Sequence, residues 1–347
     1  MLVGNFMESI DKQVLYVYDK LSNTNVPERI RDKVNLLFDI DCQSIELFRI
    51  KQIFCNVKRL YHADIVHTHH TKSAFFLSVF ILTLRLLRIK NIKRIHTAHR
   101  DISLLSLISR AIYRYVVFPV SDFIICNSEA TKFVIMNFTN NARIQTIYNG
   151  VDTDRFFVSD GLARSNTLKV ITVGRLISVK NHEVIIRAIS DCLLEGVDVE
   201  LAIIGDGPER FRLQALIENL DVSASVSLLG NIKHQDVPMY LQGYDVYVAS
   251  SWSEGFGNAT IEAGLCGLAV LASNIPVHRE IGGGNFSLFD PYSHNELKSQ
   301  LICHQESRSP LSVSESAQYF HKFSEQICVS KHHKLYMDLL NENNNTV

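Results

Sequence analysis

Cysteine pairs at the spacing of a metal-binding or disulfide motif are absent from this chain of 347 residues. The seven cysteines are odd in number and scattered, and none forms Cys-x-x-Cys. This pattern excludes a zinc cage and a disulfide-stapled secreted scaffold. We therefore expect buried thiols in a reducing compartment.

Long hydrophobic runs are absent as well. The longest apolar stretch, residues 74–84, contains Ser78 and Thr83, and it is shorter than the about 20 residues that a membrane-spanning helix needs. Residues 1–20 carry five charged side chains, which interrupt the apolar core that a secretory signal peptide requires. The sequence predicts neither a transmembrane helix nor an export signal, so we expect a cytoplasmic protein.

Net charge is nearly absent, at −1, but the two halves of the chain differ. Residues 1–150 hold 20 Lys and Arg against 12 Asp and Glu, whereas residues 151–347 hold 15 against 24. Six of the basic residues fall between positions 85 and 100. Such asymmetry concerns partners rather than fold. We expect this half to contact an anionic membrane surface at the inner face of the cytoplasmic membrane. Nucleic acid is not expected, because no motif for binding it is present.

Apolar strand patterns and helical patterns alternate along most of the chain. Strands are predicted at residues 13–18, 64–68, 93–97, 123–127, 145–148, 169–173, 200–204, 225–229, 245–249, 269–272 and 286–289. Helices are predicted at residues 72–87, 104–117, 129–138, 181–194, 208–219, 259–266 and 323–340. Because most of the strands are continuous apolar runs, they indicate parallel sheets covered on both faces. The pattern restarts after the turn sequence of residues 149–152. The fold class is therefore α/β, with two Rossmann-like, doubly wound domains facing a central cleft.

The domain boundaries follow from the same pattern. Residues 1–150 form the first predicted domain and residues 151–322 the second. Residues 323–347 are expected to form a terminal helix that packs back toward the first domain, with a frayed tail.

A glycine turn in residues 250–264 is the most informative motif of the chain. It follows a buried strand pattern and leads into a helix, so backbone N–H groups and the positive end of the helix dipole converge on one point. Glu254 precedes the turn and Glu262 lies within the helix. Amides that hold phosphate, beside carboxylates that bind hydroxyl groups, suit a nucleotide-sugar. The same pattern also fits an ordinary strand-to-helix turn with two acids that face solvent.

Two basic residues and a second glycine turn belong to the same predicted edge of the sheet. Arg175 ends one strand, and Lys180 starts the next helix. Both would provide countercharge for a diphosphate. Gly205 and Gly207 form another turn, at the end of the next predicted strand, residues 200–204. A surface pair without function is the alternative for the two cations, although basic residues are disfavoured at a helix start.

In order and spacing, these motifs resemble the retaining GT-B glycosyltransferases of family 4, the glycosyl transferases group 1. The matching pieces are Val-Gly-Arg-Leu…Lys-Asn at 173–181, Ile-Gly-Asp-Gly-Pro-Glu at 204–209, Glu254 and Glu262 with seven residues between them, and Tyr-Asn-Gly-Val-Asp…Phe at 148–156. The resemblance covers about residues 60–290. It implies a GT-B fold with a donor-binding second domain and an acceptor-binding first domain.

The resemblance also implies roles for individual residues. Arg175 and Lys180 would hold the donor diphosphate and stabilise the departing nucleotide, in place of a metal. Glu254 would bond hydroxyl groups of the transferred sugar, and Glu262 would bond the ribose. Further donor contacts would come from the two glycine turns, at Gly205, Gly207, Gly255, Phe256, Gly257 and Asn258. No cofactor is implied, since the nucleotide-sugar, for which UDP is our choice of carrier, is a substrate.

Histidines gather at two predicted strand ends in the first half. His67 and His69 end one strand, and His99 with Arg100 ends the next. A cluster of this density can bind a metal, but no acidic residue is spaced to complete a ligand set. The resemblance instead places His69 against the donor sugar or the acceptor hydroxyl, as a catalytic residue. His67, which we expect to point into the sheet, is an acceptor-side candidate together with His99 and Arg100.

The first residues depart from the family pattern. Family members begin with a strand and a glycine-rich loop, whereas residues 1–9 here are predicted to be a helix and residues 14–18 the second strand. The first strand is therefore expected to be missing, which would expose the ladder of its neighbours. This leaves open whether the chain as given is active without that loop.

The predicted function is a retaining, metal-independent glycosyltransferase of surface polysaccharide biosynthesis, such as lipopolysaccharide, O-antigen or capsule. Its acceptor would be lipid-linked or a saccharide. One alternative is a non-catalytic nucleotide-sugar-binding partner of another transferase, and a second is a GT-B nucleotide-sugar epimerase.

Overall fold

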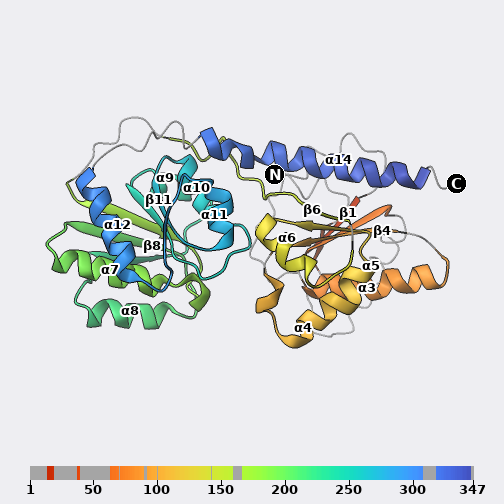
Figure 1. The fold of residues 1–347 in the computed structure, drawn as a ribbon, viewed down its shortest axis with the longest axis horizontal. Helices are drawn as coiled ribbons and strands as arrows, with labels where there is room; N and C mark the ends of the chain where they lie inside the picture. The colour runs from red at the N-terminus through yellow and green to blue at the C-terminus, as the bar shows by residue number, and fades with distance from the viewer. Residues whose placement is uncertain are drawn as a thin grey trace. The chain divides into compact units, whose positions relative to one another are not determined.

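Two compact units make up the chain: Met1–Gly150 with Glu325–Val347, and Val151–Ser324. They are seen in a computed structural model, which describes residues 14–18, 37–39, 63–69, 71–89, 92–99, 101–141, 143–158, 166–307 and 318–344. Each unit contains a parallel sheet of six strands (Figure 1). The predicted α/β class with two parallel sheets is confirmed. The helix predicted over residues 1–9 lies outside the described residues.

The sheet of the first unit has the strand order β2-β1-β3-β4-β5-β6. Its strands are β1 (Val14–Tyr18), β2 (Leu37–Asp39), β3 (Ile65–His69), β4 (Lys93–Ala98), β5 (Phe123–Cys126) and β6 (Ile144–Thr146). Every strand except β2 was predicted. The central strands β3 and β4 are almost wholly buried, as expected of parallel strands that are covered on both faces.

β1 pairs directly with β3, in parallel, with Val14 opposite Ile65. On its other edge β3 pairs with β4. Both edges of β3 are therefore paired. The expectation that a missing first strand would leave its neighbours with an unpaired edge is wrong for β3.

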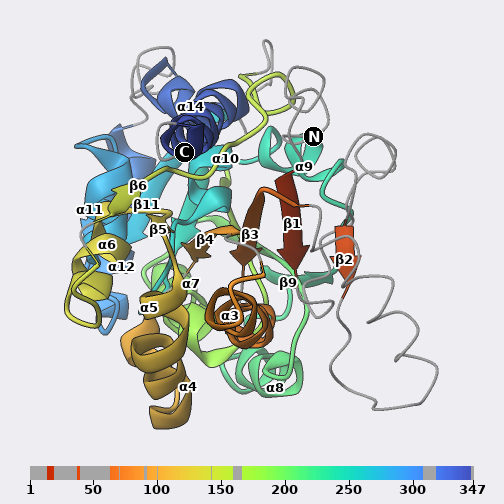
Figure 2. The same ribbon diagram turned by 90° about the vertical axis from the view of Figure 1, so that its right-hand side faces the viewer.

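Helices cover both faces of this sheet. They are α3 (Thr71–Leu86), α4 (Leu107–Ile112), the π-helix η3 (Tyr113–Val117), α5 (Phe118–Val120), α6 (Glu129–Met136) and α14 (Glu325–Asn344), with a 3-10 turn η2 (Ile102–Leu104). Figure 2 shows α3 on one side of the sheet and α14 on the other. The single helix predicted over residues 104–117 is thus divided, and its last turn widens into η3.

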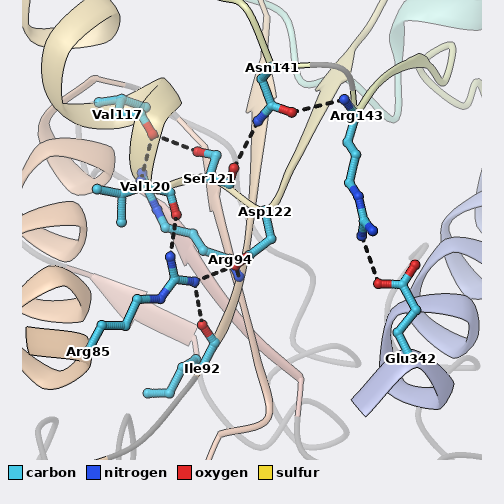
Figure 3. A network of polar contacts seen from close by, with 10 residues as sticks. All are labelled: Arg85, Ile92, Arg94, Val117, Val120, Ser121, Asp122, Asn141, Arg143 and Glu342. Carbon is cyan, nitrogen blue, oxygen red and sulfur yellow. Dashed lines mark hydrogen bonds and ion pairs between the residues drawn. The ribbon is translucent and has the colours of Figure 1, made fainter. Parts of the chain in front are cut away.

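A buried arginine explains how the wide turn η3 is stabilised. Arg94 on β4 is fully buried. Its guanidinium donates to the carbonyl oxygen of Val117 at 2.9 Å (Figure 3) and to that of Ala74, also at 2.9 Å. Burial lowers the pKa of Arg94 to about 9, although the carboxylate of Asp122 acts in the opposite direction. Asp122 in turn accepts from the Arg94 backbone N–H at 2.7 Å and from Arg85. The buried guanidinium thus donates to a carbonyl at the end of η3 and to one on α3, and it joins the two helices.

The sheet of the second unit has the strand order β12-β11-β10-β7-β8-β9. Its strands are β7 (Leu168–Val173), β8 (Val199–Ile204), β9 (Val226–Gly230), β10 (Val246–Ala249), β11 (Ala269–Ser273) and β12 (Ser287–Phe289). All six were predicted. Aliphatic side chains of β7, β8, β10 and α7 form its core.

The helices of this unit include three that were not predicted: α9 (Val237–Leu241), α11 (Pro276–Gly282) and α12 (His294–Ser307). The others are α7 (His182–Leu194), α8 (Arg210–Asn219) and α10 (Asn258–Leu265), with short 3-10 turns η4 (Ser178–Lys180) and η5 (His321–Phe323). α8 begins at Arg210, two residues after Pro208, which was expected to be the first residue of the helix.

The chain enters and leaves the second unit at neighbouring positions. Val151 forms a parallel bridge with Ser324, and its N–H donates to the carbonyl of Phe323 at 2.8 Å. A Cβ atom on Gly150 would lie 2.8 Å from the Cα atom of Glu325. Glycine is therefore required where the two crossings of the chain approach each other.

Candidate functional site

The candidate donor site lies where the connections of the second sheet change direction. β7 and β10 are neighbours, yet the strands that follow each of them run outward to opposite edges of the sheet. Loops that leave two such strands at their carboxyl ends diverge, and the space between them is the usual ligand position of an open α/β sheet. Arg175 and Lys180 follow β7, and Glu254 follows β10. The fold therefore brings together three residues that the sequence assigned to one site.

Lys180 and Glu254 form an ion pair between these two loops. Ser251 donates to the same carboxylate oxygen at 2.7 Å, and the hydroxyl of Ser250 binds the backbone carbonyl of Lys180 at 2.8 Å. Burial acts to raise the pKa of Glu254, but the charge of Lys180 and the hydrogen bonds from Lys180 and Ser251 outweigh it and lower the pKa. Glu254 is thus an ionised carboxylate, partly buried, with an ammonium group beside it.

Arg175 belongs to the same β7 loop and is exposed. Its backbone carbonyl accepts from Nε2 of His182 at 3.2 Å, which fixes the first turn of α7 against the loop. Asn181 adopts the left-handed conformation (φ 50°) just before α7. The residue is an asparagine, which tolerates that conformation better than most.

The glycine turn 255–257 leads into α10, as predicted. Gly257 is the N-cap of α10, with φ 89°, a conformation that favours glycine. The first turn of an α-helix presents N–H groups that have no partner within the helix. Phe256 is buried, and its ring packs edge-on against Phe323 at 5.5 Å between centroids. The phenyl group therefore anchors the turn, so any contribution of Phe256 to a ligand would come from its backbone.

Glu262 lies one turn into α10 and is 6% exposed. Nε2 of His234 donates to its Oε1 at 3.0 Å. This hydrogen bond is the main cause that raises the pKa of His234 above its usual value. Glu254 and Glu262 therefore have different side-chain partners, Lys180 and His234, and the site offers two separate carboxylates.

Gly205 and Gly207 have a packing reason to be glycine. A Cβ on Gly205 would lie 1.9 Å from the carbonyl oxygen of Gly174, and one on Gly207 would lie 2.4 Å from that of Leu176. The β8 loop thus lies directly against the β7 loop that carries Arg175. These two glycines hold the loops together, whether or not they also touch a ligand.

Two buried histidines of this site were not recognised in the sequence. His182 and His278 are 4% and 0% exposed. Burial lowers the pKa of His182 to about 4 and also lowers the pKa of His278. Nδ1 of His278 faces the carbonyl oxygen of Ser273 at 2.9 Å, so that nitrogen carries the proton. The second unit therefore holds two buried neutral imidazoles, His182 on α7 and His278 on α11. His234 was also missed, because only the fold brings its loop to Glu262.

The histidines of the first unit form a stacked group at the ends of β3 and β4. His67 is buried in the sheet, as expected, and its ring stacks on His69 with centroids 4.4 Å apart. Nδ1 of His69 and Nε2 of His99 share a hydrogen bond of 2.7 Å. The predicted neighbours His69 and His99 are therefore in direct contact. Arg100 lies outside the described residues.

Metal-binding geometry is absent from the part of the chain that the structure describes. Within it, no group of three or more His, Cys, Asp or Glu side chains is placed to hold a metal ion. Among the same residues, no helix has the length and apolar character needed to cross a membrane.

Comparison with known proteins agrees with this geometry. The family model described as glycosyl transferases group 1 matches residues 155–315, and the model of glycosyltransferase family 4 matches residues 35–155. The crystal structure of Anabaena HepE with UDP and glucose is similar in fold, with a TM-score of 0.80 at 17% identity, over 94% of this chain and 100% of that one.

Two relatives with assigned functions are similar in sequence. The gpi3 subunit of phosphatidylinositol N-acetylglucosaminyltransferase from Schizosaccharomyces pombe is 23% identical over 299 residues, which are 81% of this chain and 65% of that one. The alpha-monoglucosyldiacylglycerol synthase of Streptococcus pneumoniae is 26% identical over 267 residues, which are 71% of this chain and 56% of that one. The matched segments thus span less than two thirds of either relative.

The two family models together cover residues 35–315 and meet at the boundary between the two units. With its two parallel sheets and the GT-B architecture of its structural neighbours, the chain belongs to the glycosyltransferases of family 4 and group 1.

Proposed function

We propose that this chain transfers a sugar from a nucleotide-sugar, with UDP as the carrier, to a lipid-linked or saccharide acceptor. The observation that carries the proposal is the ion pair of Lys180 and Glu254 at the carboxyl ends of β7 and β10. It sets an ammonium group, suited to phosphate, beside a carboxylate, suited to hydroxyl groups. A sugar joined to a diphosphate presents those two chemistries side by side.

Different residues of the second unit bind different parts of the donor. Arg175 and Lys180 supply positive charge for the diphosphate, and the N-terminal turn of α10 adds backbone N–H groups. Glu254 accepts hydrogen bonds from the transferred sugar, and Glu262 accepts them from the ribose. The comparison with HepE, whose structure contains UDP and glucose, supports this choice of ligand.

Transfer is proposed to retain the anomeric configuration without a metal. The acceptor hydroxyl forms its bond to the anomeric carbon on the face from which the diphosphate leaves. The bond from that carbon to the phosphate oxygen breaks, and the acceptor proton passes to the leaving phosphate. Lys180 and Arg175 stabilise the negative charge that grows on the diphosphate. Glu254 is ionised and is therefore not a general acid, unlike the protonated carboxyl group of a glycosidase.

Calorimetric titration tests the donor site. The purified chain is titrated with UDP, GDP and their common sugar conjugates, and the titration is repeated with Glu262→Ala and Arg175→Ala. Each variant should weaken binding at least tenfold, about 1.4 kcal/mol. The matched control is Glu306→Ala, which removes an exposed carboxylate from α12 of the same unit and should leave affinity unchanged. Wild-type protein that binds no nucleotide would contradict the proposal.

The acceptor side is proposed to work at an anionic membrane surface. The outer face of α3 exposes Phe76, Val79, Leu82 and Leu86, while its inner face packs into the core. Residues 71–119 contain nine Lys and Arg and one acidic residue, Asp101. An apolar helix face flanked by positive charge is the pattern of a helix that lies in a lipid interface. Two of the relatives are named for glycolipid synthesis, which agrees with a lipid acceptor.

Liposome flotation tests the membrane surface. The chain should float with anionic vesicles at low salt and be released at high salt. Phe76→Ser and Leu86→Ser should each reduce flotation. Phe211→Ser on α8 is the control, since this side chain is 88% exposed but lies in the other unit. Equal flotation with neutral and anionic vesicles would count against the charge argument.

We further propose that the reaction builds a surface polysaccharide at the inner face of the cytoplasmic membrane. Incorporation of a labelled sugar into lipid extracts of the producing cell, with and without the gene, tests this role. A label that appears only in water-soluble small molecules would refute it.

A non-catalytic role is the second candidate. One relative is named as a subunit of a transferase, so the chain could supply the donor site to an assembly. Nucleotide-sugar binding by the pure chain, without release of free nucleotide until cell extract is added, would favour this alternative.

A further inference from the structure

A chain of hydrogen bonds links the C-terminal helix to the histidines of the first unit. The hydroxyl of Tyr336 on α14 lies 2.6 Å from Nδ1 of His67 on β3. Nε2 of the same ring lies 2.6 Å from Oγ1 of Thr97 on β4. Tyr336 and His67 are fully buried, and Thr97 is nearly so. Hydrogen bonds this short, away from water, hold their partners in fixed orientations.

Both ring nitrogens of His67 are therefore used. Burial, followed by the nearby charges of His332, His96 and His99, lowers the pKa of His67 well below its usual value. A neutral imidazole has one donor and one acceptor nitrogen. One hydroxyl must then donate to the ring and the other must accept from it, so removal of either hydroxyl takes a hydrogen bond away from a buried ring nitrogen.

His67 in turn supports His69. The two residues are two positions apart on β3, so their side chains leave the same face of the sheet. Their rings are stacked, with centroids 4.4 Å apart and planes 28° apart. His69 is also hydrogen-bonded to His99 at 2.7 Å. The ring of His69 is thus held from one side by His67 and from another by His99.

α14 has a second polar anchor, which lies away from these histidines. Glu342 accepts from Arg143 at 2.7 Å (Figure 3). Both side chains of this ion pair are about half exposed. Among the described residues, α14 contacts His67 through the hydroxyl of Tyr336 and through the ring of His332, whose centroid lies 5.9 Å from that of His67. The ion pair of Arg143 and Glu342 involves none of these residues.

We propose that Tyr336 is a positioning residue, which acts through His67 and Thr97 to set the orientation of the His69 ring. The proposal deepens the proposed function and rests on it for the consequence that turnover depends on this orientation. α14 thereby acts as part of the acceptor-side machinery, in addition to closing the first unit.

The first test measures ring geometry and needs no activity. Histidine labelled with ¹³C at Cε1 is introduced into the full chain, and the signals of His69 and His99 are assigned with His69→Gln and His99→Gln. Tyr336→Phe should move both signals at a fixed pH. The matched control Arg143→Ala breaks the other anchor of α14 and should move neither signal.

The second test measures turnover. With a UDP-sugar as probe, release of UDP should fall about ten- to hundredfold in Tyr336→Phe, since small displacements of reacting groups have effects of that size. The KM for the donor should stay within twofold, because the donor residues lie in the other unit. Thr97→Val should reproduce the loss, and Thr97→Ser, which keeps the hydroxyl, should restore it. If Tyr336→Phe folds poorly, these two variants of Thr97 test the same series of hydrogen bonds at its other end.

The outcomes separate the two proposals. Unmoved His69 and His99 signals in Tyr336→Phe and Thr97→Val, or equal movement in Arg143→Ala, would overturn the positioning role. If the signals move in Tyr336→Phe but the wild-type protein releases no UDP from any UDP-sugar, the positioning of His69 is upheld and the proposed function is refuted instead.

Discussion

The buried His182 should make the second unit lose stability as the pH falls. Its Nε2 faces the carbonyl oxygen of Arg175 at 3.2 Å, so that nitrogen carries the proton. Nδ1 is buried and has no hydrogen-bond partner among the described residues. Protonation would therefore add a buried charge and a buried donor without an acceptor, which is the physical reason that the pKa is low.

The magnitude follows from the pKa of His182, which burial lowers from 6.5 to about 4. Because the folded pKa lies below the unfolded one, the unfolded chain binds more protons between these two values. Stability is then fully present above about pH 6.5 and is lost as the pH falls toward 4. Between pH 7 and pH 5, the free energy of unfolding should fall by about 2 kcal/mol through this group alone.

Urea unfolding, monitored by tryptophan fluorescence, measures the fall in the free energy of unfolding of the second unit. Trp252 is the only tryptophan, and its backbone N–H donates to the carbonyl of Val179 at 2.9 Å, so its emission reports on the unit that contains His182. His182→Gln should remove about 2 kcal/mol of the pH dependence. The control His321→Gln removes an exposed histidine from the same unit and should keep the wild-type slope. Parallel slopes for wild type and His182→Gln would refute the assignment of a neutral, buried imidazole.

Three further predictions concern other parts of the structure. Gly207→Ala should destabilise the second unit by about 1–3 kcal/mol, because the added Cβ would lie 2.4 Å from the carbonyl oxygen of Leu176; the same urea experiment measures it, and an unchanged midpoint would contradict it. Arg94→Leu should lower protection from hydrogen exchange in the first unit by about 2–5 kcal/mol, since two buried carbonyl groups each lose the hydrogen bond from the guanidinium, although Ser121 and Ser78 still donate to them. Glu254→Gln should weaken binding of a UDP-sugar at least tenfold, about 1.4 kcal/mol, while affinity for UDP alone changes less, and equal losses in the two titrations would show that Glu254 does not contact the sugar.

The strands could be predicted because their signal is local. A buried parallel strand is a continuous apolar run, as in Val246–Ala249, and such a run needs no tertiary information to be recognised. The missed elements lack a strong local signal. α9 has five residues, and α12 buries only Leu297 and Leu301 among polar neighbours.

Boundaries failed where the tertiary structure decides them. The helix predicted over residues 104–117 widens into the π-helix η3, which is stabilised by Arg94 from β4. The sequence of residues 104–117 gives no sign of this contact, because Arg94 lies more than twenty residues before Val117, to whose carbonyl it donates.

The candidate site shows the same division between local and tertiary information. Glu254 and Glu262 could be found because a strand, a turn and a helix place them at fixed spacing. Their partners could not be found in that way. His234 lies 28 residues from Glu262, and Lys180 lies 74 residues from Glu254. Spacing along the chain identifies the reactive groups, whereas strand order decides which charges they meet.

Strand order also explains how the two loops after β7 and β10 can together contact both parts of the proposed donor. β7 and β10 are neighbours only because the chain builds outward from β7 to β9 and then returns to start the other edge at β10. Their loops diverge at the carboxyl ends, so Lys180 and Glu254 meet across the gap while α10 carries Glu262 onward by one turn. A ligand that fits must extend from a phosphate toward hydroxyl groups in two directions. A nucleotide-sugar has that form, with the sugar on one side of the diphosphate and the ribose on the other, whereas a free sugar phosphate would leave Glu262 unused. The strand order therefore supports our proposal that the ligand of this site is a nucleotide-sugar rather than a sugar phosphate.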